Sequence, residues 1–129
     1  MTARRILVVE DNPRNLKLVR DVLQFSGYEV VEASTGEDSV RLADETLPDL
    51  ILMDLQLPGI DGVEALQRIR AQHGRSGIPP VPVVAVTAFA MDQDRQRAYA
   101  SGFDGYVEKP INVRRLLQQV GELLSGSGA

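Results

Sequence analysis

The sequence contains no cysteine, a single histidine and no long hydrophobic run. Without cysteine the chain can form neither a disulfide nor a thiolate metal site, which fits a reducing compartment, and we expect a cytoplasmic protein. The formal net charge of -4 provides no basic surface for a nucleic-acid backbone, so we expect no direct nucleic-acid binding. The first apolar run, Ile6–Val9, is too short for a signal-peptide core or a membrane span, and we expect no membrane association.

The residues that are present are typical of one soluble globular domain. The chain has 129 residues, of which 43% are hydrophobic and 25% charged, enough for a single core and too few for two domains. We expect residues 1–124 to form this domain. Residues 125–129, Ser-Gly-Ser-Gly-Ala, have the composition of a flexible C-terminal tail.

Short apolar runs alternate with helical patterns along the domain. The runs are rich in Val, Ile and Leu or bounded by turn residues, and they predict strands at residues 5–10, 28–33, 49–53, 82–86 and 105–107. Strands that alternate with helices form βα units, in which the strands lie parallel. The predicted fold class is therefore α/β, with a doubly wound, five-stranded parallel sheet.

The segments between and after these runs predict helices, most of them from the spacing of apolar residues. The third should begin at a cap formed by Asp61 and end near His73, which we expect to be solvated and without function. The fourth, residues 91–101, is mostly polar, so we expect it to dock loosely. The apolar stripes of the other helices are Leu16, Val19 and Leu23; Val40, Ala43 and Leu47; and Val113, Leu116, Leu117, Val120, Leu123 and Leu124.

Polar side chains follow several of the predicted strands. They are Glu10 and Asp11 after the first strand, Asp54 after the third, Thr87 after the fourth and Lys109 after the fifth. Because the ligand crevice of an open α/β sheet lies beyond the carboxyl ends of its strands, we expect these side chains to share a pocket. An acid after a strand can equally cap the next helix, and for any single acid here both interpretations stay open.

The three acids taken together favour a cation site. Carboxylates in contact repel one another, so a cation or a proton must offset their charge in the folded state. With no cysteine and one histidine, the ligands of that cation should be oxygen atoms. Mg²⁺ fits, because it prefers a few carboxylates together with water and phosphate oxygens.

Four segments in this order carry a family resemblance. They are Ile6-Leu-Val-Val-Glu-Asp-Asn12, Asp49-Leu-Ile-Leu-Met-Asp-Leu-Gln-Leu-Pro-Gly-Ile-Asp-Gly62, Val83-Val-Ala-Val-Thr-Ala88 and Lys109-Pro110. Each is weak alone, but together they resemble the response-regulator receiver family of the CheY-like superfamily over nearly the whole chain. The resemblance implies a flavodoxin-like fold with strand order 2-1-3-4-5. Residues 87–91 also resemble stand-alone receivers related to DivK and the receivers of hybrid kinases.

The resemblance implies a role for each matching residue. Asp54 matches the phosphorylated aspartate, and Glu10 stands where many members have Asp, so that its longer arm should reach the metal through water. Thr87 and Tyr106 match the switch pair, and the Lys109–Pro110 peptide bond is expected to be cis. The Mg²⁺ ligands that the resemblance implies are Glu10, Asp11, Asp54 and the backbone carbonyl of Gln56, and the phosphate-pairing groups are Thr87 and Lys109.

The implied function is a signalling switch rather than an enzyme with a separate substrate. The expected phosphodonor is a sensor histidine kinase or a histidine phosphotransfer protein, and the chain would catalyse its own Mg²⁺-dependent transfer and dephosphorylation. We expect Thr87 to move toward the phosphate and Tyr106 to turn inward. That motion would remodel the face made by the fourth helix, fifth strand and fifth helix, where a downstream protein would bind.

Three other classes of protein fit the same residues less well. A flavin or nucleotide carrier fits poorly, because Glu10-Asp11-Asn12-Pro13 offers two anions and no glycine to a phosphate. A phosphohydrolase resembling the haloacid-dehalogenase group would have a second Asp where Gln56 stands. A receiver that only binds partners is disfavoured because all the functional positions are filled. For Tyr106, a half-buried strand residue with its hydroxyl in water is the plain alternative.

Overall fold

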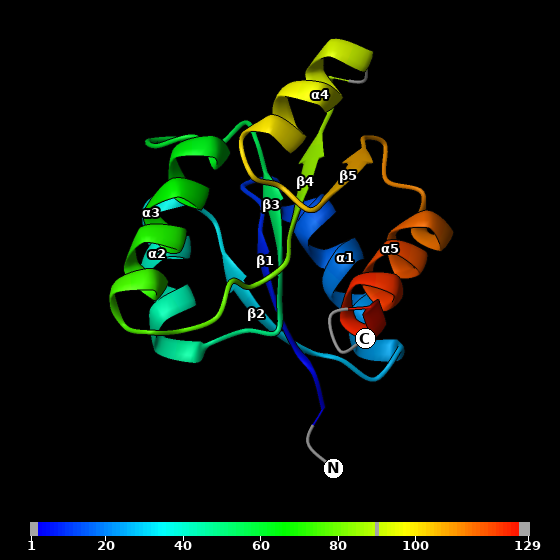
Figure 1. Ribbon diagram of the computed structural model, residues 1–129. Helices are drawn as coiled ribbons and strands as arrows, with labels where there is room; N and C mark the ends of the chain where they lie inside the picture. Colours follow the sequence, from blue (N-terminus) through cyan, green and yellow to red (C-terminus); the bar gives the residue numbers. More distant parts are fainter. Residues whose placement is uncertain (1–2, 90, 127–129) are drawn as a thin grey trace.

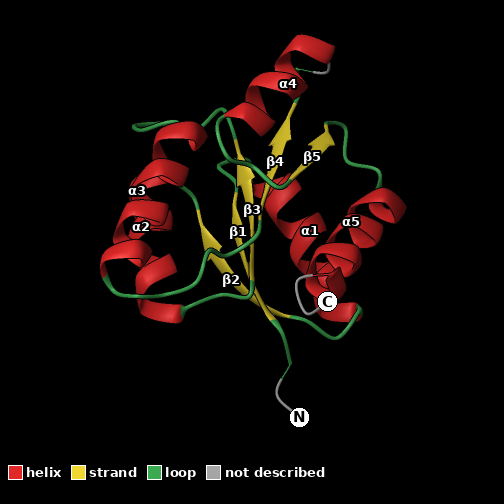
Figure 2. Cartoon of the chain, viewed as in Figure 1, coloured by secondary structure: helices red, strands yellow, loops and turns green. Residues whose placement is uncertain are grey.

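Short apolar runs form a single parallel sheet in the computed structural model, which describes residues 3–89 and 91–126 (Figure 2). The strands are β1 (Arg5–Val9), β2 (Glu29–Ala33), β3 (Leu50–Asp54), β4 (Val83–Thr87) and β5 (Gly105–Glu108). Their order is β2-β1-β3-β4-β5, and every pair is parallel. Every residue of β3 and β4 is buried, as expected for central strands covered on both faces. The predicted fold class and strand order are confirmed.

Helices cover both faces of the sheet and divide the core into two layers (Figure 1). The helices are α1 (Pro13–Phe25), α2 (Gly36–Thr46), α3 (Gly62–Arg75), α4 (Asp92–Ala100) and α5 (Val113–Gly126). Because side chains alternate along a strand, Leu7 and Ile51 face the layer of α2 and α3, whereas Ile6 and Leu52 face α1 and α5. Across the described part of the chain, none of the helices combines the length and apolarity needed to span a membrane.

The helix starts are fixed by side chains that sequence reasoning can recognise. Asn12 caps α1 by accepting hydrogen bonds from the backbone N–H groups of the first turn, and Thr35 caps α2. Asp61 caps α3 by accepting from the N–H of Glu64, as predicted. Met91 at the start of α4 makes no side-chain cap, and α4 buries only Ala98. This helix projects past the end of the sheet in Figure 1, in agreement with the loose docking expected from its sequence.

Two predictions about side chains are wrong. His73 was expected to be solvated, but it is only 3% exposed, because it continues the buried stripe of Leu66 and Ile69 on α3. Its Nε2 lies 3.1 Å from the carbonyl oxygen of Ala43 on α2. Leu47 was placed on the apolar stripe of α2, but it is the left-handed C-cap of that helix, with φ of 47° and 52% exposure. Pro48 prevents the helix from continuing through it.

The C-terminal helix continues past the boundary expected for the domain. α5 ends at Gly126, so Ser125 is helical although the expected tail began there. Residues 127–129, the remainder of that tail, lie outside the described residues.

Gly62 is needed where α3 starts, because a side chain there would strike the backbone at the end of β3. A Cβ at Gly62 would lie 2.6 Å from the carbonyl oxygen of Asp54 and 2.9 Å from Cα of Leu55. We predict that Gly62→Ala lowers the free energy of unfolding by about 1–3 kcal/mol, because neither backbone atom can move freely. Urea denaturation measures this change.

Gly74 is a matched control in the same helix. A Cβ there would meet nothing within 4 Å. Since Ala is a better helix former than Gly, Gly74→Ala should raise stability by up to about 1 kcal/mol. If Gly62→Ala and Gly74→Ala changed the free energy of unfolding in the same direction, the role given to Gly62 would be contradicted.

Candidate functional site

The strand register brings distant acids together at the carboxyl edge of the sheet. Val9 of β1 pairs with Met53 of β3, so the next residues, Glu10 and Asp54, emerge side by side. Asp11 follows Glu10 at the start of the β1–α1 loop. Carboxylate oxygens from these three residues all lie within 4.8 Å of one another. The predicted convergence of the acids is therefore present in the structure.

The acids differ in their contact with solvent. Asp54 is 1% exposed and Glu10 is 4% exposed, whereas Asp11 is exposed at the rim. Two buried carboxylates with a third at the mouth form a site that is open on one side. Such a site can hold a hard cation that keeps water on its outer side.

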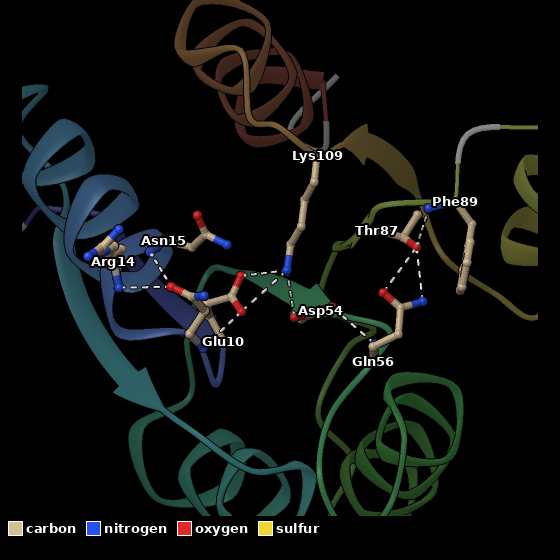
Figure 3. A network of polar contacts seen from close by, with 9 residues as sticks. Glu10, Arg14, Asn15, Asp54, Gln56, Thr87, Phe89 and Lys109 are labelled. Atoms are coloured by element: carbon tan, nitrogen blue, oxygen red, sulfur yellow. Dashed lines mark hydrogen bonds and ion pairs between the residues drawn. The ribbon is translucent and has the colours of Figure 1, made fainter.

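Lys109 reaches between the two buried acids, as Figure 3 shows. Its Nζ lies 2.8 Å from Oδ2 of Asp54 and 3.0 Å from Oε1 of Glu10. The backbone N–H of Lys109 donates to the carbonyl oxygen of Thr87 at 2.8 Å, which ties the loop after β5 to β4. The Lys109–Pro110 bond is cis, as expected. Burial alone would lower the pKa of Lys109, but its hydrogen bonds to Asp54 and Glu10 outweigh burial and raise that pKa.

Glu10 has the most perturbed acidity in the cluster. Burial, followed by its hydrogen bond to Asp54, raises its pKa from 4.5 to about 7, although Lys109 and the N–H of Asn12 act in the opposite direction. The ammonium group of Lys109 therefore does not fully offset the negative charge of both buried carboxylates. Near neutral pH, a proton on Glu10 supplies part of the missing positive charge.

This raised pKa predicts that Glu10→Gln stabilises the metal-free protein above pH 7. Below pH 4.5 the carboxyl is protonated in both the folded and unfolded states, so its ionisation costs nothing. As pH rises from 4.5 toward 7, the carboxyl of Glu10 ionises in the unfolded chain but not in the folded one. The free energy of unfolding therefore falls until the carboxyl also ionises in the folded protein. The shift in the pKa of Glu10 corresponds to a loss of about 1–3 kcal/mol in the free energy of unfolding. Urea denaturation from pH 4 to pH 8 in a chelating buffer should show the variant gaining most at the alkaline end.

Asp44→Asn supplies a control for this pH effect. Asp44 is an exposed acid on α2, away from the cluster. Its substitution should leave the pH profile of stability close to that of the wild type. A Glu10→Gln protein that loses stability at pH 8 would contradict the picture of an under-compensated acid.

Thr87 lies beside the cluster, and its hydroxyl is already engaged. It is fully buried at the end of β4. Its Oγ1 accepts from Nε2 of Gln56 at 3.2 Å and from the backbone N–H of Phe89 at 3.1 Å. The backbone N–H of Gln56 in turn donates to Oδ1 of Asp54 at 3.0 Å. Gln56 and Phe89 therefore connect the acid cluster to the loop after β4.

Tyr106 continues this connection toward α4. Its ring is 7% exposed, and its hydroxyl donates to the backbone carbonyl of Phe89. Burial, together with the charges of Asp94 and Glu108, raises the pKa of this hydroxyl. We expected the ring to turn inward on activation, but here it is already inward. The plain alternative of a hydroxyl in water is also wrong.

Some of these contacts were missed by sequence reasoning. The two backbone groups of Phe89 leave no trace in residue type, so no pattern could reveal them. The side chain of Gln56 offered a signal, because it follows Asp54 by two positions on the same edge of the sheet. The hydrogen bond from its side-chain amide to Thr87 was not predicted.

A groove opens on the face made by α4, β5 and α5. Its volume is about 470 Å³, and it lies beside Tyr106 rather than over the acids. Side chains of both charge signs, amides and aromatic rings line it: Arg95, Tyr99, Tyr106, Val107, Glu108, Pro110, Asn112, Arg115 and Gln119. The acid cluster and the groove are thus joined through Gln56, Thr87 and Phe89.

The fold and this cluster define a class: doubly wound α/β domains of the CheY-like type, with acids and a lysine at the carboxyl edge of the sheet. Within that class, the chain belongs to the response regulator receiver domain family, whose profile matches residues 6–121. It is therefore a receiver domain of two-component signalling, acting as a signalling switch.

Known proteins support this assignment. The polar-differentiation response regulator DivK of Brucella ovis is 40% identical over 117 residues, covering 91% of this chain and 93% of DivK. The receiver domain of a sensor histidine kinase from Pseudomonas aeruginosa, which has a magnesium ion coordinated in its active-site cleft, matches with a TM-score of 0.84 and 35% identity. That match covers 96% of this chain and 99% of the other.

A third relative was solved together with a partner. It is the receiver domain of the Saccharomyces cerevisiae response regulator Ssk1, in a co-crystal structure with the histidine phosphotransfer protein Ypd1. The TM-score is 0.91 with 30% identity, and the match covers 98% of this chain and 92% of the other. The resemblance inferred from the sequence is confirmed at the level of family and fold.

Proposed function

We propose that Asp54 accepts a phosphoryl group from a phosphohistidine on a partner protein. The observation that carries this proposal is the buried carboxylate of Asp54, which lies 2.8 Å from the ammonium group of Lys109 within a cluster of acids. A carboxylate in this position can act as a nucleophile. The phosphorylated Asp54 that results is anionic, and the ammonium group of Lys109 already lies beside it.

In the transfer, a carboxylate oxygen of Asp54 attacks the phosphorus atom. The phosphorus–nitrogen bond of the phosphohistidine breaks, and the imidazole leaves with the electron pair and takes a proton from solvent. Lys109 pairs with an oxygen of the transferred phosphoryl group, and the hydroxyl of Thr87 donates to another. The phosphoryl group is removed by hydrolysis, in which water attacks phosphorus, the carboxylate of Asp54 leaves and inorganic phosphate is released.

The residues at this edge fit a Mg²⁺ ion. Glu10, Asp11 and Asp54 supply carboxylate oxygens within 4.8 Å of one another, and the backbone carbonyl of Gln56 would add a further ligand. When bound, Mg²⁺ would neutralise the charge that builds up between an anionic nucleophile and an anionic donor. Burial raises the pKa of Glu10 to about 7 even though Lys109 acts in the opposite direction, which supports a place for further positive charge beside this carboxyl group.

The proposed partners follow from the same site and from the groove. The proposed donor is a sensor histidine kinase or a histidine phosphotransfer protein, as the Ssk1–Ypd1 complex suggests. The proposed location of the exchange is the cytoplasm. The groove of about 470 Å³ on α4, β5 and α5 is the proposed face for a downstream protein. Phosphorylation would change this face through Thr87, Phe89 and Tyr106.

Phosphoimidazole, a small model of phosphohistidine, tests the proposal without the natural partner. Incubation with phosphoimidazole and Mg²⁺ should add the mass of one phosphoryl group to the intact protein and release imidazole. A folded protein that gains no phosphoryl group from this donor would contradict the proposed function.

A further inference from the structure

The hydroxyl of Thr87 is held by the same residue that follows the phosphoacceptor strand. Nε2 of Gln56 donates to Oγ1 of Thr87 at 3.2 Å, and Oε1 of Gln56 lies 3.5 Å from the same oxygen. Both polar atoms of the amide therefore face one hydroxyl. Thr87 is completely buried, whereas Gln56 is exposed, so Gln56 covers this hydroxyl from the solvent side.

A hydroxyl has one proton and two lone pairs. In Thr87 the lone pairs accept from Nε2 of Gln56 at 3.2 Å and from the N–H of Phe89 at 3.1 Å. Oε1 of Gln56, at 3.5 Å, lies in nearly the same direction as Nε2, so it cannot accept the hydroxyl proton at the same time. The proton is therefore left for a phosphoryl oxygen on Asp54 to accept. Any movement of the hydroxyl toward Asp54 also lengthens the contact with Nε2 of Gln56.

We propose that the side chain of Gln56 is a latch that holds Thr87 in its resting position, so that the phosphoryl group must displace it before the switch can engage. This inference rests on the proposed function of Asp54. Gln56 acts as a positioning residue here, because it works through Thr87 rather than on the reacting atoms. The stronger the hydrogen bond between Gln56 and Thr87, the more the cost of breaking it reduces the affinity for the phosphoryl group.

The latch also lies on the path toward the groove. The N–H of Phe89 donates to Thr87, and the carbonyl of Phe89 accepts from the hydroxyl of Tyr106. A movement of Thr87 away from Gln56 therefore shifts the backbone at Phe89, which Tyr106 also contacts. A strong hydrogen bond from Gln56 keeps this segment in place, and a weak one lets it move more easily.

Beryllofluoride with Mg²⁺, a non-covalent mimic of a phosphoryl group on an aspartate, measures the cost of release. Gln56→Met keeps the length of the side chain but removes its hydrogen bonds. Since one such bond is worth about 0.5–1.5 kcal/mol, the variant should bind beryllofluoride roughly two- to tenfold more tightly than the wild type. Fluorine NMR of the bound fluoride gives the affinity. Gln67→Met, an exposed glutamine on α3, is the matched control and should leave it unchanged.

A double-mutant cycle separates a latch from a general change in the loop. In a Thr87→Val background there is no hydroxyl to hold, so adding Gln56→Met should give no further tightening. Gln56→Met that binds no more tightly than the wild type, or a gain that persists in Thr87→Val, overturns the latch. If the wild type shows no binding that depends on Asp54, as tested with Asp54→Asn, the proposed function itself fails and the latch fails with it.

Discussion

Asp54→Asn is expected to abolish phosphorylation of the protein by phosphoimidazole. The amide is a far weaker nucleophile than a carboxylate, and it cannot form the acyl phosphate. Intact-mass measurement after incubation with the donor and Mg²⁺ should show the unmodified mass alone. The variant should remain folded, because removing one charge from a crowded group of acids relieves repulsion.

Asp44→Asn is the control for this loss. Asp44 is an exposed acid on α2, outside the cluster, and its substitution should leave the extent of phosphorylation unchanged. A phosphoryl adduct of undiminished amount on Asp54→Asn would assign the chemistry to another residue.

Removal of divalent metal is expected to have the second largest effect. With excess chelator, phosphorylation should slow by about a hundred- to a thousandfold, because the metal supplies several kcal/mol of charge stabilisation and each 1.36 kcal/mol is tenfold in rate. The rate of adduct formation by intact mass, with Mg²⁺ or chelator, measures this directly. Added Mg²⁺ should also raise the melting temperature, since it binds the folded cluster of Glu10, Asp11 and Asp54.

Asp11→Asn tests whether this metal acts at the acid cluster. Asp11 lies at the exposed rim, so its loss should weaken the response to Mg²⁺ while the fold persists. Equal rates of phosphorylation with Mg²⁺ and with chelator would contradict the metal site. So would an unchanged melting temperature across a Mg²⁺ titration of the wild type.

The fold and the convergence of the acids were predictable from the sequence for a simple reason. Parallel strands deliver the residues that follow them to one edge, so Glu10, Asp54 and Lys109 needed only correct strand assignments to be placed together. The apolar runs of β1, β3 and β4 are buried on both faces and stand out clearly. The N-cap at Asp61 follows from equally local chemistry.

The contacts that were not predicted depend on tertiary geometry. His73 is buried because α2 packs over its end of α3, and its residue type suggested the opposite. Leu47 is apolar like the other residues of its predicted stripe, but α2 ends before it, so Leu47 does not lie on the buried face of the helix. The link from Thr87 to Tyr106 uses the backbone N–H and carbonyl of Phe89, groups that every residue type except proline possesses.

The most direct test is to locate the phosphoryl group itself. After phosphorylation in Mg²⁺, borohydride reduction converts an acyl phosphate into an alcohol, and tandem mass spectrometry of the peptides identifies the altered residue. The modification is expected at Asp54, beside Lys109 and the acids that follow β1. A phosphorylated protein whose altered residue lies elsewhere would contradict the account.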